Sequence, residues 1–169
     1  MQEPKLTKTF LNYFKKLDTK HKTCLEIGSG DSILFLSKRF KYLSSLESHK
    51  PWYKKIIQNK PYNVDIKLFK KSNIIEILKK ELQKKPDFVI IDNNPNYISR
   101  LDIAIFIHLN KKNDCIIVLD NGNWNLDAFW FLRSHYFLAF TLHSFSGDVS
   151  ILCIDLFSST KTICSICFL

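Results

Sequence analysis

Short apolar segments alternate with amphipathic ones along almost the whole chain, and this alternation constrains the fold more than any other feature. Seven segments have the length and pattern of strands, one of them (64–69) alternating polar and apolar residues, namely residues 23–27, 42–46, 64–69, 88–91, 115–119, 137–142 and 150–157. Six segments place apolar residues at helical spacing, namely 6–16, 32–40, 51–58, 74–85, 97–110 and 126–135. Repeated strand–helix–strand units favour right-handed crossovers and a parallel sheet covered by helices on both faces. We therefore predict an α/β fold with a doubly wound, Rossmann-like, mostly parallel sheet in three α/β/α layers.

The end of the chain departs from this rhythm, because two predicted strands follow each other without a helix between them. The turn residues Ser146, Gly147 and Asp148 separate these strands, which indicates a C-terminal hairpin that contributes an antiparallel strand. Two of the helices also carry a predicted core face. In helix 97–110 the predicted core face comprises Leu101, Ala104, Ile105 and His108. In helix 126–135 it comprises Leu126, Phe129 and Trp130.

With 169 residues, the chain is long enough for one domain with a substantial core. We expect residues 1–169 to form that single domain, with a lead-in helix within 1–22 and a tail at 159–169. No run approaches the roughly 18 apolar residues of a membrane span, and 1–22 lacks the apolar run of a signal peptide. The five cysteines are scattered, and the pair Cys164 and Cys167 has no second pair or nearby histidine to complete a zinc set. These features favour a cytoplasmic protein with reduced thiols.

The positive charge lies almost entirely in the first half of the chain. Residues 1–85 carry 20 Lys and Arg against 8 Asp and Glu, a balance of +12, whereas residues 86–169 carry 5 against 8, a balance of −3. A basic half can attract nucleic acid or an anionic membrane surface. However, 22 of the 25 cations are lysine, which is more typical of solvated helix faces than of phosphate-reading sites. Nucleic acid is therefore the less favoured partner.

Glycine and acidic residues mark the ends of several predicted strands. Gly28 and Gly30 follow strand 23–27, where they allow a sharp turn and close approach of a ligand. Glu47 ends the next strand, 47 − 28 = 19 residues after the first glycine, a spacing that suits a carboxylate on the ribose of an adenosine ligand. Asp92 and Asp120 end two later strands. Ligands of such sheets bind at the carboxyl ends of the strands, so we expect the binding site at this edge.

Two residues argue against a dinucleotide ligand. The dinucleotide motif has a third glycine where this chain has Ile33, and a branched side chain there hinders close helix packing. Glu26, just before the turn, is a poor neighbour for a diphosphate but a good one for the ammonium group of an amino acid. An NAD-linked oxidoreductase is therefore the weaker interpretation.

The ordered motifs resemble those of the class I S-adenosylmethionine-dependent methyltransferases. Four segments carry the resemblance: Leu25 to Gly30, Ser45 to His49 with Pro51-Trp52-Tyr53 after it, Asp87 to Asp92, and Ile116 to Asn121. The family implies that Gly28 and Gly30 approach the methionine portion, with Glu26 near its ammonium, and that Asp92 lies beside the sulfonium and the acceptor. Ser29 and Ser32 belong to the same cofactor-binding turn.

The resemblance also implies residues for the adenosine portion. Glu47 would bind the ribose, and Ser48 and His49 would border the adenine. The chain departs from many members of the family after the third strand, where Lys70, Lys71 and Ser72 replace the acid that binds the adenine amine. Glu47 also has a purely structural alternative, because an acid at a strand end often caps the next helix.

Asp92, Asp120 and Asn121 form a second candidate set. They resemble the magnesium-binding residues of catechol-type O-methyltransferases, and three oxygen ligands with waters would suit Mg²⁺. The lysine that those enzymes place shortly after the first aspartate is absent. The alternative is that Asn121 and Gly122 simply form a turn that uses positive φ.

Proton acceptors and acceptor-binding groups are less well defined by sequence. Asp92 is the preferred catalytic residue; the other candidate bases are Asp120, His108, His135 and His143. Trp124, Phe129, Trp130 and Phe131 follow the fifth strand, where they could stack on an acceptor, although core packing is the favoured role. Arg100 could clamp an acceptor carboxylate or phosphate, or lie on the helix surface.

Together these features predict a methyltransferase that uses S-adenosylmethionine, with Mg²⁺ as an additional possibility. The expected acceptor is a small molecule or a sugar, methylated at oxygen. Two alternatives remain: a non-catalytic module that binds S-adenosylmethionine or a nucleotide, and a nucleic-acid-directed methyltransferase that uses the basic half.

Overall fold

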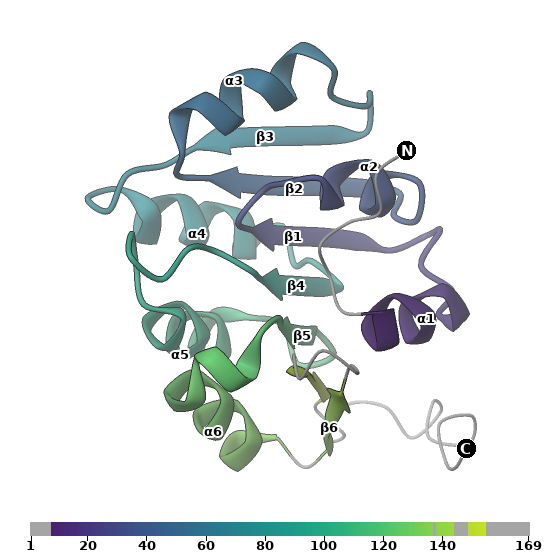
Figure 1. Ribbon diagram of the computed structural model, residues 1–169, viewed down its shortest axis with the longest axis vertical. Coiled ribbons are helices and arrows are strands. Elements are labelled where there is room, and N and C mark those ends of the chain that lie inside the picture. Colours follow the sequence, from purple (N-terminus) through teal and green to yellow (C-terminus); the bar gives the residue numbers. More distant parts are fainter. Residues whose placement is uncertain (1–7, 137, 144–148, 155–169) are drawn as a thin grey trace.

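A computed structural model describes residues 8–136, 138–143 and 149–154. Seven strands form one sheet in the order β3-β2-β1-β4-β5-β7-β6 (Figure 1). The strands are β1 (Thr23–Ile27), β2 (Tyr42–Glu47), β3 (Val64–Leu68), β4 (Phe88–Ile91), β5 (Ile116–Leu119), β6 (Leu138–His143) and β7 (Val149–Ile154). The helices are α1 (Lys8–Lys16), α2 (Ser32–Ser37), α3 (Lys50–Gln58), α4 (Ile74–Gln83), α5 (Arg100–Asn110) and α6 (Leu126–His135), with a 3-10 turn η1 (Gly122–Trp124) after β5.

The sheet confirms the predicted α/β architecture. Strands β1 to β5 pair in parallel with one another, whereas β7 is antiparallel to both β5 and β6. The predicted antiparallel pairing of the last two strands is therefore confirmed, while the turn at 146–148 lies outside the described residues. The expected tail at 159–169 and the pair Cys164 and Cys167 also lie outside them. None of the described helices is long and apolar enough to cross a membrane.

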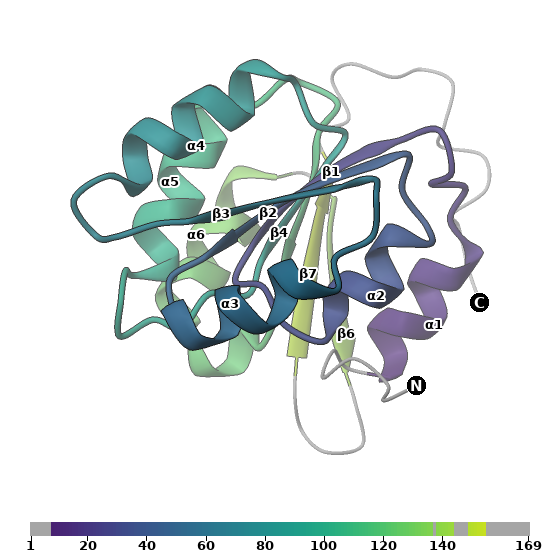
Figure 2. The same cartoon turned by 90° about the horizontal axis from the view of Figure 1, so that it is seen from above.

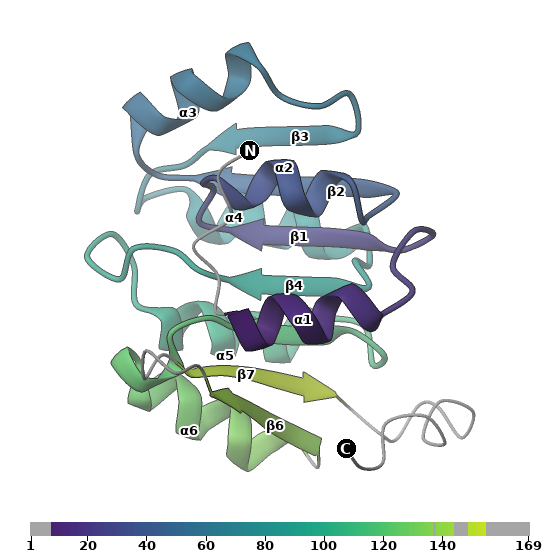
Figure 3. The ribbon, with the colours of Figure 1, turned by 45° about the vertical axis from the view of Figure 1, so that its right-hand side comes forward.

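Helices cover both faces of the sheet, and the strand side chains alternate between them. Helices α1, α2 and α3 lie on one face and α4, α5 and α6 on the other (Figures 2 and 3). On β1, Cys24 packs in the core cluster on the α1–α3 side, and Leu25 packs in the cluster on the α4–α6 side. Both faces are thus apolar, as a parallel strand buried on two sides requires. Glu26 is the exception on this strand, because it is a buried carboxyl group.

Helix α5 begins three residues later than predicted because Ser99 caps it. The Ser99 hydroxyl accepts hydrogen bonds from the backbone N–H groups of Leu101 (3.1 Å) and Asp102 (3.4 Å). These bonds satisfy two of the donors that a helix leaves unpaired in its first turn. The preceding residues from 92 to 98 therefore remain a loop at the end of β4.

The predicted core faces of α5 and α6 are partly wrong. In α5 the buried residues are Arg100, Ile103, Ala104 and Ile107, whereas Leu101, Ile105 and His108 are only partly buried. In α6 they are Ala128, Phe129 and Leu132. Leu126 and Trp130 are 57% and 59% exposed, so the side of α6 that carries them faces solvent. The predicted packing role therefore holds for Phe129 but not for Trp130.

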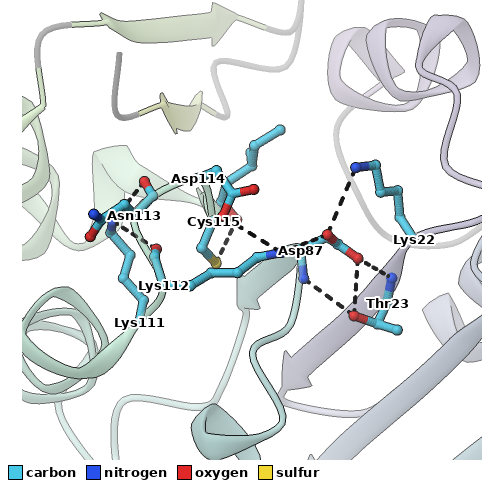
Figure 4. A network of polar contacts seen from close by, with 9 residues as sticks. Lys22, Thr23, Asp87, Lys111, Lys112, Asn113, Asp114 and Cys115 are labelled. Atoms are coloured by element: carbon cyan, nitrogen blue, oxygen red, sulfur yellow. Dashed lines mark hydrogen bonds and ion pairs between the residues drawn. The ribbon is translucent and has the colours of Figure 1, made fainter. Parts of the chain in front are cut away.

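A hydrogen-bonded clasp joins three strands at the amino edge of the sheet. The Asp87 carboxylate, just before β4, accepts from the Thr23 backbone N–H (2.7 Å) and from Lys112 Nζ (2.7 Å), as Figure 4 shows. The Thr23 hydroxyl adds a third bond (3.1 Å). These charge-assisted bonds hold the pKa of Asp87 below its usual range, although burial opposes them. The clasp therefore stabilises the fold far from the carboxyl edge.

Asp87→Ala is expected to lower the free energy of unfolding by about 2 kcal/mol, because Lys112 and the Thr23 N–H lose their acceptor. Urea unfolding near neutral pH measures the change. Because the folded pKa of Asp87 is depressed, its contribution is present above the ordinary Asp pKa and is lost as the pH falls through the folded value. Asp114→Asn is the matched control, since Asp114 is 57% exposed and lies 3.6 Å from the same lysine. An equal loss in both variants would contradict the clasp.

Candidate functional site

The carboxyl edge brings the ends of four strands together. The backbone N–H of Gly28 donates to the Leu46 carbonyl (2.9 Å), which joins the turn after β1 to β2. On the other side, Asp92 N–H donates to the Ile27 carbonyl (2.8 Å), and Asp120 N–H donates to the Ile91 carbonyl (3.1 Å). The residues that end β2, β1, β4 and β5 are therefore neighbours at one edge, toward which the arrowheads of β1 to β4 point in Figure 1.

The two glycines of the turn after β1 have different structural roles. Gly28 has φ +100°, and a Cβ atom there would lie 2.3 Å from the Asp92 carbonyl oxygen and 2.6 Å from the Asn93 nitrogen. The absence of a side chain thus permits the turn to approach the end of β4. A Cβ atom on Gly30 would have no neighbour within 4 Å. The space over Gly30 is therefore open to a ligand.

Glu26 is buried beneath this turn and is bound by serines. Its two carboxylate oxygens accept from the hydroxyls of Ser32 (2.5 Å) and Ser45 (2.5 Å), and the Ser29 hydroxyl lies 2.5 Å from that of Ser45. Burial raises the pKa of Glu26 to about 7, although both serine hydrogen bonds lower it. Only 1% of Glu26 is exposed; Ser32 contacts it directly, and Ser29 is linked to it through Ser45.

Glu47 organises the backbone around the next strand end. Its Oε1 accepts from the His49 backbone N–H (2.6 Å), and His49 is the N-cap residue of α3. Burial raises the pKa of Glu47, while hydrogen bonds from the backbone amides of His49, Ser48 and Ser29 oppose that rise. The carboxylate therefore joins the turns after β1 and β2. Glu47 therefore has the structural role considered for it from the sequence, at the start of the next helix. It also lies at the carboxyl edge of the sheet.

Asp92 lies against a buried arginine. Arg100 Nη2 is 3.2 Å from Asp92 Oδ1, Arg100 Nε donates to the Asn93 carbonyl (2.8 Å), and Nη1 donates to the Asp120 carbonyl. Burial raises the pKa of Asp92 above its usual range; nearby Asp120 adds to the rise, and Arg100 opposes it. The Asp92 side chain is 29% exposed, so it faces both Arg100 and the solvent side of the site.

Arg100 corrects both interpretations offered from the sequence. Arg100 is 6% exposed, so it is not a surface residue. Its guanidinium donates hydrogen bonds to three groups of the protein and is therefore not left free to bind a substrate carboxylate or phosphate. Next to it, Asn93 is 1% exposed and donates its amide to the Ile98 carbonyl (2.8 Å). Asn93 Oδ1 has no hydrogen-bond partner and is the one such buried side-chain atom among the described residues.

The candidate metal set does not fit a divalent cation. The Arg100 guanidinium already binds an Asp92 oxygen and the Asp120 backbone. Asn121 adopts the left-handed conformation (φ 49°, ψ 47°), and its carbonyl accepts from Trp124 N–H (3.0 Å) and from the Asn125 amide (3.0 Å). The turn alternative for Asn121 is therefore present. No group of three His, Cys, Asp or Glu residues in the described ranges could hold a metal ion.

Two of the candidate histidine bases lie away from the strand ends. His108 and His135 are at the C-terminal ends of α5 and α6, and their rings are 5.0 Å apart. His108 Nδ1 is 3.0 Å from the Tyr136 hydroxyl, and His135 Nδ1 is 2.8 Å from the Phe131 carbonyl. Both therefore have structural roles near the amino edge. His143 ends β6, which runs parallel to β5, so Asp92, Asp120 and His143 are the candidate bases whose backbone lies at the carboxyl edge.

The importance of Ser45 and Arg100 was missed by sequence reasoning. Ser45 is paired with Glu26 in the parallel register of β1 and β2, which places both side chains on the same face of the sheet. A glutamate inside an apolar strand was a signal that a hydroxyl partner should exist on a neighbouring strand. Arg100 gave a weaker signal, because it is a single arginine at a helix start eight residues after Asp92.

Two hollows of about 440 and 290 Å³ lie at the opposite, amino edge of the sheet. The first is lined by lysines and Arg39 between the ends of α1 and α2, and the second by lysines between the ends of α4 and α5. Cations at helix C-termini stabilise the helix dipoles, which explains their placement without a ligand.

Comparison with solved structures identifies the fold. An O-methyltransferase from Bacillus cereus in complex with SAH superposes with a TM-score of 0.61 and 15% identity over 79% of this chain and 74% of the other. A putative O-methyltransferase from Klebsiella pneumoniae gives 0.65 and 16% over 87% and 79%. Spermidine synthase from Thermotoga maritima gives 0.61 and 13% over 88% and 60%. No protein-family model and no curated protein sequence matches the chain.

The resemblance inferred from the motifs is confirmed at the level of the fold, which is that of the class I S-adenosylmethionine-dependent methyltransferases. The identities are low, and spermidine synthase shows that this fold serves more than one named activity. The function must therefore be argued from the site.

Proposed function

We propose that this chain binds S-adenosylmethionine at the carboxyl edge of β1, β2 and β4 and transfers its methyl group to an oxygen of a small-molecule or sugar acceptor. The observation that carries the proposal is the convergence of the Gly28–Gly30 turn, Glu47 and Asp92 on three hydrogen-bonded strand ends. The fold of known methyltransferases supports it, as does the open space over Gly30.

Each residue has a defined task in the proposed binding mode. Glu26, through Ser32 and through the Ser45–Ser29 pair, favours the ammonium of the methionine portion, because a buried carboxyl group gains from a nearby cation. Glu47 accepts hydrogen bonds from the ribose hydroxyls with the carboxylate lone pairs that the backbone amides of Ser29, Ser48 and His49 do not occupy. Ser48 and His49 lie beside the adenine. The exposed residues Lys70, Lys71 and Ser72 follow β3, so the adenine amine needs a different partner from the acid of many relatives.

The bound cosubstrate supplies an electrophilic methyl group on a sulfonium. The protein positions the acceptor oxygen in line with that group and excludes water. Asp92 takes the acceptor proton as the new oxygen–carbon bond forms. The ionised form of Asp92 is the form that accepts this proton, and its raised pKa makes it a stronger base than an ordinary aspartate.

An exposed aromatic surface beyond β5 suits the acceptor. Trp124, Leu126 and Trp130 are 75%, 57% and 59% exposed; Trp124 ends η1, and Leu126 and Trp130 lie in the first half of α6. Large apolar rings stack on flat acceptors and on the apolar faces of sugars. These residues therefore support a planar or sugar acceptor rather than a highly charged one.

Calorimetric titration with S-adenosylmethionine and S-adenosylhomocysteine tests the proposal, with NAD as a negative control. Glu47→Gln is expected to weaken binding by about tenfold, because one charged acceptor of the ribose hydroxyls becomes a neutral amide. Glu81→Gln is the matched control: Glu81 is buried on α4, bound to Lys67, Lys84 and Ser44, and its loss should lower stability without changing affinity. A folded protein that binds neither compound contradicts the proposed function.

Transfer itself is tested with S-adenosylmethionine labelled on the methyl carbon and a panel of hydroxylated aromatic and sugar acceptors. Label recovered in an ether product supports methylation at oxygen. Tight binding without transfer to any acceptor would favour a non-catalytic binding module instead.

A further inference from the structure

The guanidinium of Arg100 occupies the space between the ends of β4 and β5. Arg100 is the first residue of α5 and is 6% exposed. Its three nitrogens contact Asp92 Oδ1, the Asn93 carbonyl and the Asp120 carbonyl. One side chain thus joins both aspartate-bearing strand ends and the loop between β4 and α5.

This geometry gives the site a cation that cannot dissociate. Arginine remains charged throughout the physiological pH range, and a buried guanidinium must stay paired with acceptors. Two of the three acceptors of Arg100 are backbone carbonyls, which carry no net charge. The positive charge of Arg100 therefore remains to balance the carboxylate of Asp92. A divalent cation placed at the same strand ends would compete for Asp92 Oδ1 and would face an unscreened positive charge.

We propose that Arg100 is the built-in cation of this site: it holds Asp92 in position and takes the place of a divalent metal between the ends of β4 and β5. Arg100 is a positioning residue, since it acts through Asp92 and contacts no reacting atom. Its part in methyl transfer rests on the proposed function, whereas its replacement of a metal is a property of the protein alone and is tested separately.

Manganese is the probe for the vacated site, because its binding is measured directly by electron paramagnetic resonance. The wild-type protein is expected to show no saturable Mn²⁺ binding. Arg100→Ala removes the guanidinium that contacts the Asp92 carboxylate and the Asp120 backbone carbonyl, so it should show the saturable Mn²⁺ binding that the wild type lacks. Saturable Mn²⁺ binding by the wild type that Asp92→Asn abolishes would overturn the proposal.

Thermal unfolding with methylguanidinium supplies a second measurement. Arg100→Ala should lower the Tm by about 10 °C, because a buried pair loses one partner. Added methylguanidinium should restore part of that loss by entering the vacated space. Arg133→Ala is the matched control, since Arg133 is an exposed arginine over the Trp130 ring on α6, and neither its Tm nor its response to methylguanidinium should change.

Two further outcomes decide the proposal if Arg100→Ala does not fold. Arg100→Lys keeps the charge but loses the planar fork, so it should fold, remain free of Mn²⁺ and melt below the wild type. Equal Tm values for Arg100→Lys and wild type would overturn the positioning role. Once a methyl acceptor is found, turnover should be unaffected by a metal chelator. If neither S-adenosylmethionine nor S-adenosylhomocysteine binds, the proposed function fails, and the Mn²⁺ results still decide whether Arg100 takes the place of a metal.

Discussion

Gly28→Ala is expected to destabilise the protein by about 3 kcal/mol or more and to lower its Tm by roughly 6–12 °C. The new Cβ atom would lie 2.3 Å from the Asp92 carbonyl oxygen and 2.4 Å from its carbon, at a residue with φ +100°. These neighbours are backbone atoms at the end of β4. Relief of the clash therefore requires β1 and β4 to separate where Asp92 N–H bonds to the Ile27 carbonyl. Thermal unfolding followed by circular dichroism, with urea unfolding for the free energy, measures the loss.

Gly30→Ala is the matched control, because it makes the same chemical change two residues away. A Cβ atom on Gly30 has no neighbour within 4 Å, so the free energy of unfolding should change by no more than about 0.5 kcal/mol. Binding of S-adenosylhomocysteine should nevertheless weaken by about tenfold if the methionine portion occupies that open space. A Gly30→Ala protein with normal stability and normal affinity would remove this turn from the proposed binding site.

Local sequence signals were sufficient to predict the strands. A strand buried on both faces is a continuous apolar run, and in this chain Gly28, Asp92 and Asp120 mark the ends of three such runs. The order of acid-terminated strands also predicted that Glu47, Asp92 and Asp120 share the carboxyl edge. These features depend on residues close together in sequence, which is why β1, β4 and α6 have the predicted bounds.

The helix faces could not be predicted in the same way. Helix α5 is apolar at residues 101, 103–107 and 109, which covers nearly its whole circumference, so spacing alone does not select the buried side. In α6, residues 128–132 are all apolar, and packing against α5 buries Phe129 while Trp130 faces solvent. The choice of face depends on neighbours that only the tertiary structure provides.

The role of Arg100 was also beyond local prediction. Two of its three acceptors are backbone carbonyls, and every residue type carries one. The side chain is buried because the ends of β4 and β5 lie against the start of α5. Arg100 and Asp120, which are in contact there, are 20 residues apart in the sequence. For the same reason the magnesium set of Asp92, Asp120 and Asn121 was plausible in sequence and is unsuitable in three dimensions.

Glu26→Gln is expected to stabilise the ligand-free protein at alkaline pH and not at acidic pH. Burial raises the pKa of Glu26 from 4.5 to about 7, so the folded protein prefers the protonated form. The cost of ionising Glu26 is absent below about pH 4.5, grows between the two pKa values and reaches about 3 kcal/mol above pH 7. The variant should therefore melt roughly 6–12 °C above the wild type near pH 8 and level with it near pH 4.5. Glu76→Gln, on the exposed face of α4, should show no difference at either pH.

The same carboxyl group should couple ligand binding to proton release. In the proposed binding mode the ammonium of S-adenosylmethionine stabilises ionised Glu26, so binding should lower its pKa and the affinity should rise as the pH increases through 7. Binding should therefore release protons near pH 7, measured by calorimetry in buffers of different ionisation enthalpy. Glu26→Gln should release none and should bind more weakly near pH 8, although it is then the more stable protein. Because stability and affinity move in opposite directions, a variant that gained or lost both would show that Glu26 serves the fold and not the ligand.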